Sequence, residues 1–588
     1  MYFEILLLSI RPAIMKIIRR DRQHQHASPH HSPLLQAVLQ NRAVENVASL
    51  DLSLKGLYPY HSLSNIEAAT DLLVQAILAE KDILIVGDYD VDGATSIALG
   101  IRVLREFGAH NVRYTVPHRI LDGYGLSRSL VQKILRNPPD LLITVDNGIS
   151  NIEGVALARE NDIDVIITDH HLPPEELPNA NAIVNPNLVG DAFPSKALAG
   201  VGVIFYLLSS VRAKLVEIGY FGDRPAPNLG KYLDIVALGT ISDLVPLDGN
   251  NRKLAQQGLL RMRQGVMIPG IGALIDVSNR KKETLSTSDI GFGVAPLLNA
   301  AGRLDNMQVG IELLLTNQPE EATAIANELF TMNEERKTIE QEMRETADSI
   351  LKEITLDSED LPLSICLYDE SWHQGITGIV ASRIKEQHYR PTFIFAYDNE
   401  GLLKGSGRSI RGIHLRDLMS NVARDHKGLI QTFGGHAMAA GLSIYEDRLP
   451  EFQAAMNQEI DAFLASQSNS DELLSQKIYS DGALPAEGFN IPFADEIKLA
   501  YPWGQQFPEP LFDDQFEVID YRILKGAHLK FTLKIPQTAM TFEAMAFFQA
   551  HQLIDNVRKI HCAFKLDINE WRGNRNLQLI VDYFEPID

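Results

Sequence analysis

The chain has 588 residues, of which 45% are hydrophobic and 22% are charged, and its formal net charge is -22 at pH 7. This length is too great for one hydrophobic core and predicts three or four domains at about 150 residues each. The acidic balance argues against generic nucleic-acid binding, although a local basic surface can coexist with it. The two cysteines, Cys366 and Cys562, lack CxxC spacing, which argues against a disulfide framework or a zinc finger and fits a reducing cytosol.

Residues 1–45 are predicted to be an N-terminal extension. The opening run MYFEILLLSIRPAIM lacks the basic start and the cleavage site of a signal peptide, and it is shorter than the roughly 20 residues of a membrane span. Met15 is an alternative start of translation. The run HQHASPHHSP suggests metal binding by its histidines, but we favour a flexible tail. We therefore expect a cytoplasmic protein that does not associate with membranes.

Residues 46–315 are predicted to form a first α/β domain. From about Asp71 to Leu260, short β-branched runs alternate with amphipathic stretches, which is typical of βαβ units on a parallel sheet. Residues 316–356 carry apolar side chains at spacings of three and four, and no Gly or Pro follows Pro319, so we expect one long connecting helix. Residues 357–465 repeat an α/β pattern and are predicted to form a smaller second domain.

Residues 466–588 are predicted to be a linker followed by a small β-barrel. Residues 521–577 contain nine Lys or Arg against four acids, whereas residues 466–520 contain two against eleven. The basic stretch is interleaved with aromatic residues: Tyr521, Phe531, Phe542, Phe547, Phe548, Phe564 and Trp571. A barrel of this composition is suited to follow a phosphate backbone and stack bases. The alternative is that most of these aromatic side chains form the barrel core.

Four apolar runs, ILIVGDYDVDG, LLITVDNG, VIITDHH and YLDIVALGTISD, each end in acidic or histidine residues. If each run is a strand of one parallel sheet, these side chains meet at the carboxyl edge of that sheet. The residues are Asp88, Asp90, Asp92, Asp146, Asp169, His170, His171 and Asp243. So much negative charge in one place predicts a site for divalent metal.

The run GDYDVDG shows how the first strand would deliver its acids. An extended Asp90-Val91-Asp92 would place both carboxylates on one side, since side chains alternate along a strand. Gly93 would then allow a tight turn into a helix whose amides could bind phosphate or orient the acids. A single Asp after a strand is more often a helix N-cap, but four such sites together favour metal.

The kinds of ligand indicate which metal and which reaction to expect. Oxygen ligands with one or two histidines favour Mn²⁺ or Mg²⁺ over structural Zn²⁺. With this many ligands we expect two ions, with Asp146 as the bridge, and the hydrolysis of a phosphoester.

Glycine-rich turns in the second domain are candidates for a substrate clamp. Ser406 and Arg408 flank Gly407 and offer a hydroxyl and a bidentate guanidinium. Gly434 and Gly435 allow close backbone approach, and His436 adds an imidazole. A structural hairpin is the alternative.

The metal runs, from Asp88-Tyr89-Asp90-Val91-Asp92-Gly93 to Asp243, resemble the motifs of the DHH phosphoesterase superfamily. The run Asn299-Ala300-Ala301-Gly302-Arg303 resembles the motif of the RecJ family of single-stranded-DNA-specific exonucleases, and the match extends from about residue 50 to the end. The runs WHQGITGIVASRI, GSGRS and FGGHAMAAGLS resemble the DHHA1 domain, and the barrel resembles an OB-fold. The resemblance implies a parallel-sheet DHH domain, a long helix, a smaller α/β DHHA1 domain and an OB-fold.

The resemblance also implies roles for individual residues. Asp90 and Asp146, with Asp88 nearby, would hold one metal ion, and Asp92, Asp146, His170 and Asp243 would hold the other. His171 would face the scissile phosphate, and Asp169 would support the histidines through a hydrogen bond. The pocket for the 5′-terminal phosphate would comprise Arg119, Arg303, Ser406 and Arg408, and Gly434, Gly435 and His436 would bind substrate.

The implied activity is 5′ to 3′ degradation of single-stranded DNA to nucleoside 5′-monophosphates, with Mn²⁺ or Mg²⁺, in DNA repair and recombination. The implied partners are single-strand-binding protein and helicases, and we expect a monomer. Single-strand preference would follow from a metal site in a channel between two domains. One departure is YPWGQQFPEPLF, in which Trp503 and Gln505-Gln506 replace the Phe and Gly-Asn that the family predicts; it bears on local loop geometry.

Three other functions are considered. A DHH phosphodiesterase of small substrates, such as nanoRNA or a cyclic dinucleotide, usually has a histidine where this chain has Asp88 and lacks the basic barrel. A non-enzymatic replication scaffold would have lost metal ligands, and the sequence keeps all of them. A dinucleotide-binding oxidoreductase would show GxGxxG after the first strand, and this sequence does not.

Overall fold

The computed structural model describes residues 15–23, 31–42, 44, 47–118, 122–356, 362–398, 401–467, 470–553 and 557–587. The described residues form two compact units. One unit comprises residues 19–333 and 480–588, and the other comprises residues 334–479 together with the described residues up to Ile18.

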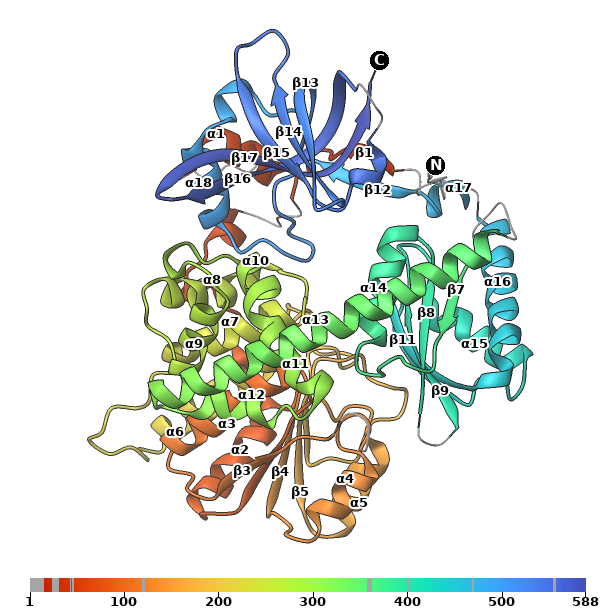
Figure 1. The fold of residues 1–588 in the computed structure, drawn as a ribbon. Helices are drawn as coiled ribbons and strands as arrows, with labels where there is room; N and C mark the ends of the chain where they lie inside the picture. The colour runs from red at the N-terminus through yellow and green to blue at the C-terminus, as the bar shows by residue number, and fades with distance from the viewer. Residues whose placement is uncertain are drawn as a thin grey trace. The chain divides into compact units, whose positions relative to one another are not determined.

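A parallel sheet forms the centre of residues 82–240, as predicted. Its strands are β2 (Ile83–Val86), β3 (Val112–Thr115), β4 (Leu141–Val145), β5 (Asp164–Thr168) and β6 (Ala182–Val184), in the order β3-β2-β4-β5-β6 (Figure 1). All four strand pairs are parallel. Every parallel strand therefore delivers its carboxyl end to the same edge.

Helices cover both faces of this sheet, because its strands are apolar on both sides. Ile83 and Ile85 face one core, and Leu84 and Val86 face another. The first core is covered by α2 (Ile66–Leu78), α3 (Val91–Glu106) and α6 (Gly200–Glu217), and the second by α4 (Arg128–Ile134) and α5 (Ile152–Glu160).

The fourth acid-ended run is a helix, so its interpretation as a strand is wrong. Residues Leu233–Ser242 form α7, and its side chains from Leu233 to Ile241 are all buried. When every face of an element is buried, its apolar residues do not recur at a regular spacing. The sequence of such a run therefore does not show whether it forms a helix or a strand. The βαβ alternation therefore stops at Val184, and helices follow: α8 (Gly249–Arg263), α9 (Pro269–Val277), α10 (Thr287–Asp289), α11 (Ala295–Leu304) and α12 (Gln308–Leu315).

The predicted long helix is present as α13 (Pro319–Leu356). Proline at its start and Glu320 and Glu321 in its first turn suit the amino end of a helix dipole. Its residues up to Asn333 belong to one unit, and those from Glu334 onward belong to the other.

The second unit contains the predicted smaller α/β domain. Its sheet is mixed, in the order β10-β11-β9-β8-β7, and only the β7–β8 pair is parallel. The strands are β7 (Ile365–Tyr368), β8 (Thr392–Tyr397), β9 (Leu402–Arg408), β10 (Thr432–Gly435) and β11 (Ala439–Tyr445). The helices are α14 (Thr377–His388), α15 (Leu415–Asp425), α16 (Leu449–Ala465) and α17 (Ser470–Leu473).

The C-terminal segment forms a closed five-stranded barrel, as predicted. Its strands are β13 (Phe512–Leu524), β14 (His528–Lys534), β15 (Thr541–Ala546), β16 (Lys559–Trp571) and β17 (Asn574–Pro586), preceded by α18 (Ile491–Ala500). Phe531 and Phe564 are core residues. Phe547 and Phe548, by contrast, expose 47% and 66% of their surface, so the aromatic residues divide between core and surface.

Described parts of residues 1–45 pack against the barrel and its linker. Strand β1 (Met15–Arg19) pairs with β12 (Gln476–Ser480), and α1 (Pro33–Gln40) buries Leu35, Val38 and Leu39 in the core that the barrel residues share. The histidines at 24, 26 and 30 lie outside the described residues. In the described part of the chain, no helix has the length and hydropathy needed to cross a membrane.

The loop that departs from the family pattern joins the barrel to the first domain. The Trp503 carbonyl accepts a hydrogen bond from Thr287, and the Gln505 carbonyl accepts one from the Leu247 amide. The Arg252 guanidinium lies 4.3 Å from the Phe507 ring centre. The loop therefore fixes the barrel to α8 and α10 within one compact unit.

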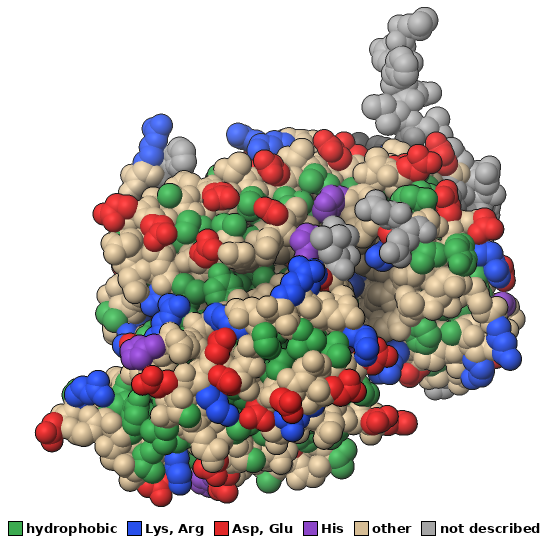
Figure 2. Space-filling model, turned by 90° about the horizontal axis from the view of Figure 1, so that it is seen from below, with side chains coloured by type: hydrophobic (Ala, Val, Ile, Leu, Met, Phe, Trp, Pro, Cys, Tyr) green, Lys and Arg blue, Asp and Glu red, His purple; other side chains and the backbone are tan. Residues whose placement is uncertain are grey.

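Charge is mixed on the molecular surface. Figure 2 shows acidic and basic side chains interspersed over the face that it draws, so the net charge of -22 is not collected in one region of that face.

A buried ion pair ties the N-terminal segment to the barrel linker, and its loss should destabilise this unit. Arg42 donates two hydrogen bonds to Asp481, at 2.6 and 2.9 Å, and each side chain is only 1% exposed. Arg42→Ala should lower the free energy of unfolding by about 3–5 kcal/mol, because it leaves a buried carboxylate without its main partner.

Urea unfolding followed by tryptophan fluorescence measures this loss. Arg113→Ala, which removes a half-exposed pair with Asp82, is the control and should cost no more than about 1 kcal/mol. Equal losses in the two variants would contradict the structural role of Arg42.

Candidate metal centre

Acidic and histidine side chains from five elements converge beyond the carboxyl edge of the parallel sheet. Asp88 and Asp90 follow β2, Asp146 follows β4, and Asp169, His170 and His171 follow β5. Asp92 lies in the first turn of α3, and Asp243 is the C-cap of α7. Asp243 therefore lies at the predicted edge of the sheet, although it follows a helix and not a strand.

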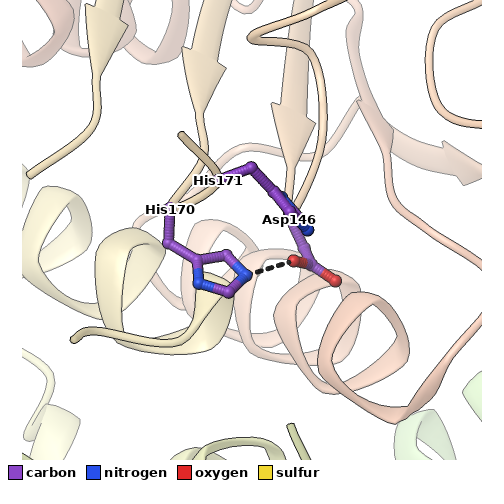
Figure 3. A group of neighbouring side chains, drawn as sticks. All are labelled: Asp146, His170 and His171. Carbon is purple, nitrogen blue, oxygen red and sulfur yellow. Dashed lines mark hydrogen bonds and ion pairs between the residues drawn. The ribbon is translucent and has the colours of Figure 1, made fainter. Parts of the chain in front are cut away.

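Three groups of ligand atoms lie close enough to hold metal ions. They are Asp88, Asp90 and Asp146; Asp92, His170 and Asp243; and Asp146, His170 and His171, with the ligand atoms of each group within 4.8 Å of one another. His170 Nε2 lies 3.0 Å from Asp146 Oδ1, as Figure 3 shows, and 3.6 Å from Asp243 Oδ2. Asp146 belongs to two of the groups, which is the arrangement that a bridging ligand needs. Carboxylates with one or two imidazoles are a donor set that suits Mn²⁺ or Mg²⁺.

Burial and mutual repulsion make the carboxylates costly to ionise together. Burial and the charge of Asp90 raise the pKa of Asp92 to about 7. Burial and the neighbouring carboxylates raise the pKa values of Asp146 and Asp243 well above the ordinary value. A divalent cation offsets this repulsion, so the charges themselves favour metal.

The two acids of the first motif do not lie on one side of an extended segment, so that prediction is wrong. Val91 begins α3, and Asp90 is its N-cap, with Oδ1 accepting a hydrogen bond from the Gly93 amide at 3.0 Å. A short acidic side chain is a favoured N-cap, which explains why the helix starts here. Asp90 thus serves as cap and candidate ligand together, and Asp92 is presented by the helix.

The carboxylate of Asp92 is held by the amino end of α6. Its Oδ2 accepts a hydrogen bond from the Gly200 amide at 2.6 Å, and its Oδ1 accepts one from the Val201 amide at 2.9 Å. These are amides that the helix itself leaves unpaired, and they carry the positive end of its dipole. This contact could not be predicted from the sequence, because Gly200 lies 108 positions from Asp92.

Asp146 has a left-handed backbone with a φ of 59°. A non-glycine residue in this region costs about 1–3 kcal/mol, so its surroundings must stabilise it. The Asn147 side chain donates hydrogen bonds to the carbonyls of Val86 and Val145, at 3.1 and 2.8 Å, and so joins the ends of β2 and β4. The backbone strain at Asp146 therefore coincides with the residue that two ligand groups share.

Asp169 orients the histidine pair. One of its oxygens accepts hydrogen bonds from the His170 and His171 amides and from His171 Nδ1, the last at 2.7 Å. Burial opposes its ionisation, but the hydrogen bond and charge of His171 outweigh burial and lower the pKa of Asp169. Burial likewise disfavours charged His171, but Asp169 outweighs it and raises the pKa of His171 to about 9. This contact turns Nε2 of His171 away from Asp169.

Tyr124 is a site residue that the sequence analysis missed. Its hydroxyl donates to the Asp146 carbonyl at 3.2 Å and lies 3.4 Å from His171 Nε2. Burial and the nearby carboxylates raise its pKa, so the hydroxyl remains a proton donor. The residue lies in the run HRILDGYG, where a tyrosine between two glycines gave no chemical signal by itself.

The residues predicted to bind the terminal phosphate divide between the two units. Arg119 lies outside the described residues. Arg303 lies on α11, and Gly302 beside it packs so closely on the Tyr89 carbonyl that a Cβ would be 2.0 Å from that oxygen. The NAAGR motif therefore contacts the first metal motif directly.

Ser406 and Arg408 lie together on β9 of the other unit. The Ser406 hydroxyl lies 2.9 Å from the Thr377 hydroxyl, and a Cβ at Gly378 would be 2.8 Å from Arg408 Nη2. Both neighbours belong to the first turn of α14. A guanidinium, a hydroxyl and a helix amino end thus come together, which are the groups that bind phosphate.

Gly434, Gly435 and His436 lie at a β-hairpin, the alternative considered for them. Gly434 and Gly435 are the last residues of β10, and the His436 amide donates to the Ala439 carbonyl. Gly435 has a φ of 137°, and a Cβ there would lie 2.5 Å from the Ala439 carbonyl. Their proposed contact with substrate remains a prediction.

Bound metal should stabilise the unit that contains the metal centre more at high pH than at low pH. The raised pKa values of Asp92, Asp146 and Asp243 mean that protons occupy the ligands as the pH falls, and Mn²⁺ must displace them. At free Mn²⁺ of 100 times its Kd, stabilisation is about 2.7 kcal/mol. Thermal unfolding with Mn²⁺ and with EDTA should show a larger difference at pH 8 than at pH 6.

The control is Asp223→Ala, which removes an exposed acid away from the cluster and should respond as the wild type does. A metal-induced shift of the same size at both pH values would contradict the ligand assignment.

Family models match three segments of the chain. The DHH family N-terminal domain matches residues 82–240, the DHHA1 domain matches residues 362–462, and the RecJ OB domain matches residues 480–583. Each of these segments contains one of the three sheets or barrels described above.

Relatives match over almost the whole length. A protein of Haemophilus influenzae named single-stranded-DNA-specific exonuclease RecJ is 47% identical over 577 residues, covering 97% of this chain and 100% of its own. The crystal structure of Thermus thermophilus RecJ with Mn²⁺ has a TM-score of 0.79 and 28% identity, covering 99% of this chain and 80% of that one. The same protein with Mg²⁺ gives a TM-score of 0.73 and 27% identity, covering 98% and 79%.

Proposed function

Because the chain belongs to the RecJ family of DHH phosphoesterases, we infer that it is a metal-dependent exonuclease specific for single-stranded DNA. We propose that it acts from the 5′ end and releases nucleoside 5′-monophosphates. The observation that carries the proposal is the convergence of three groups of ligand atoms, of which two contain Asp146 and two contain His170.

The residues of the metal centre have different proposed roles in phosphodiester hydrolysis. We propose that Asp88, Asp90 and Asp146 hold one divalent ion, and that Asp92, Asp146, His170 and Asp243 hold a second. Bound Mn²⁺ or Mg²⁺ would activate water and neutralise charge on the phosphoryl group. Asp169 holds His171 by its Nδ1, so Nε2 can donate to a phosphate oxygen, and the Tyr124 hydroxyl is placed to share that role.

Selection of the 5′ end is assigned to the second unit. Arg408 and Ser406, beside the amino end of α14, supply a charge and hydrogen-bond donors for a terminal phosphate. We propose that Arg119 and Arg303 also bind phosphate and that Gly434, Gly435 and His436 contact the strand. An anchored terminal phosphate would fix the polarity of degradation.

Retention of the single strand is assigned to the barrel. The exposed Phe547 and Phe548 flank His528, with ring centres 5.5 and 4.5 Å from it. Phe548 also has a φ of 58°, a strained conformation for an aromatic residue. Exposed aromatic rings suit the stacking of unpaired bases, whose faces are all accessible. A small-substrate phosphodiesterase would have no use for this surface.

We further propose that the protein acts as a monomer in the cytoplasm, where bacterial DNA lies. Single-strand-binding protein and helicases are the partners that would supply its substrate. The buried free thiols of Cys366 and Cys562 suit that reducing compartment.

Digestion of labelled DNA tests the function. Single-stranded and duplex DNA with a label at the 5′ nucleotide should differ, with the single strand alone yielding labelled mononucleotide when Mn²⁺ is present and EDTA absent. Asp146→Ala should lower the rate more than about 100-fold, because it removes the ligand shared by two groups. Asp223→Ala is the control of equal charge change.

Two outcomes would contradict the proposal. Near-normal activity of Asp146→Ala would refute the shared ligand. Cleavage of dinucleotides with long single strands spared would assign the chain to the phosphodiesterases of small substrates.

The role of Arg408 is tested by its effect on end preference. Arg408→Ala should reduce the ratio of rates on 5′-phosphorylated and 5′-hydroxyl strands by about tenfold or more, because a guanidinium–phosphate contact is worth about 1.5–3 kcal/mol. Arg424→Ala, which removes an exposed arginine of the same unit, should leave the ratio unchanged. An unchanged ratio in Arg408→Ala would remove this residue from the phosphate pocket.

A further inference from the structure

The Asp92 carboxylate occupies a socket between two helices. Its oxygens accept hydrogen bonds from the first two amides of α6, and the residue is 1% exposed. On its other side lies Gly239 in the middle of α7, where a Cβ would be 3.0 Å from Asp92 Oδ1. Asp92 is thus bordered by backbone amides of α6 and by Gly239 of α7, which has no side chain.

Two glycines keep this socket open. A Cβ at Gly200 would lie 2.5 Å from Asp146 Cβ and 2.9 Å from Asp146 Cα. A Cβ at Gly239 would lie 2.3 Å from Thr95 Oγ1 and 2.8 Å from Val201 Cγ1. These separations are shorter than real Cβ contacts, so either substitution must shift its neighbours.

Neither glycine is needed for its backbone conformation. Both lie in helices, and neither has the positive φ that favours glycine. A glycine inside a helix costs about 0.5–1 kcal/mol relative to alanine, so α7 loses stability at Gly239. The structure shows what compensates for this cost: the absence of side chains at Gly200 and Gly239 leaves room for Asp92 and Asp146.

We propose that Gly200 and Gly239 are positioning residues of the metal centre, which set the place of Asp92 and its distance from Asp146. The proposal rests on the proposed function, because it assumes that these carboxylates bind metal. It goes further in assigning specific roles to α6 and α7, which supply no metal ligand at these two positions.

The two glycines have different consequences. The three atoms nearest to a Cβ at Gly239 include Asp92 Oδ1 and no atom of Asp146, so Gly239→Ala should weaken only the group of Asp92, His170 and Asp243. Gly200 borders Asp146 and also donates its amide to Asp92, so Gly200→Ala should weaken both proposed ions. A general loss of stability would not separate the sites in this way.

The experiment counts bound Mn²⁺ in the full-length protein, using the electron paramagnetic resonance signal of the free ion. The wild type should bind two ions. Gly239→Ala should keep one with wild-type affinity and bind the other at least about tenfold more weakly, which is the usual scale for loss of ligand support. Gly200→Ala should bind both more weakly.

Gly202→Ala is the matched control. It adds the same methyl group two residues further along α6, but the three atoms nearest to its Cβ would all belong to the Leu198 side chain, the closest at 3.1 Å. It should bind two ions with wild-type affinity. Circular dichroism establishes that each variant is folded.

A second variant removes a hydrogen bond to Asp92 and leaves both glycines in place. Val201→Pro deletes the amide that donates to Asp92 Oδ1, at a position in the first helical turn where proline is tolerated. It should weaken one ion only. If a glycine variant fails to fold, Mn²⁺ binding by Val201→Pro tests the positioning role in its place.

The outcomes separate the proposals. Two ions bound normally by folded Gly239→Ala, or by Val201→Pro if Gly239→Ala does not fold, would overturn the positioning role while leaving the nuclease function intact. A wild type that binds two ions but does not cleave DNA would overturn the proposed function and leave the socket standing. A wild type that binds fewer than two ions would overturn both.

Discussion

Repulsion among buried carboxylates is the constraint around which the larger unit is organised. Six acidic side chains, from the ends of three strands and from two helices, meet at one edge of the sheet. Burial and the neighbouring carboxylates raise the pKa values of Asp92, Asp146 and Asp243. The protein offsets part of this charge with its own dipoles. Amides of α6 bind Asp92, the Gly93 amide binds Asp90, and the histidines and Ile149 amide bind Asp169. Divalent cations offset the rest of the negative charge, and the same cations would take part in phosphodiester hydrolysis.

The residues proposed for catalysis and those proposed for the choice of substrate lie in different parts of the chain. The ligands belong to one sheet edge, whereas the candidate phosphate pocket lies on β9 and α14 of the second unit, and the exposed aromatic residues lie on the barrel. The barrel shares a compact unit with the metal centre through the loop at Trp503, while the phosphate pocket belongs to the other unit.

The sequence predicted elements that local chemistry determines and missed those that depend on tertiary contact. The strands before Asp88, Asp146 and Asp169 were found because apolar runs ended in acids. The run before Asp243 was mistaken for a strand, since complete burial removes the period that would identify a helix. Gly200, Gly239 and Tyr124 escaped notice because glycine and tyrosine acquire their roles only from neighbours far away in the chain. The α/β order, the long helix and the barrel required only patterns of composition.

We propose that Asp146 joins two metal ions at the edge of the sheet. Anomalous diffraction from crystals grown with Mn²⁺ tests this bridging role, because the scattering locates each ion without reference to activity. We expect two anomalous peaks, each with an Asp146 oxygen as a ligand, one beside Asp90 and the other beside His170 and Asp243. A single peak, or two peaks of which only one contacts Asp146, would contradict it.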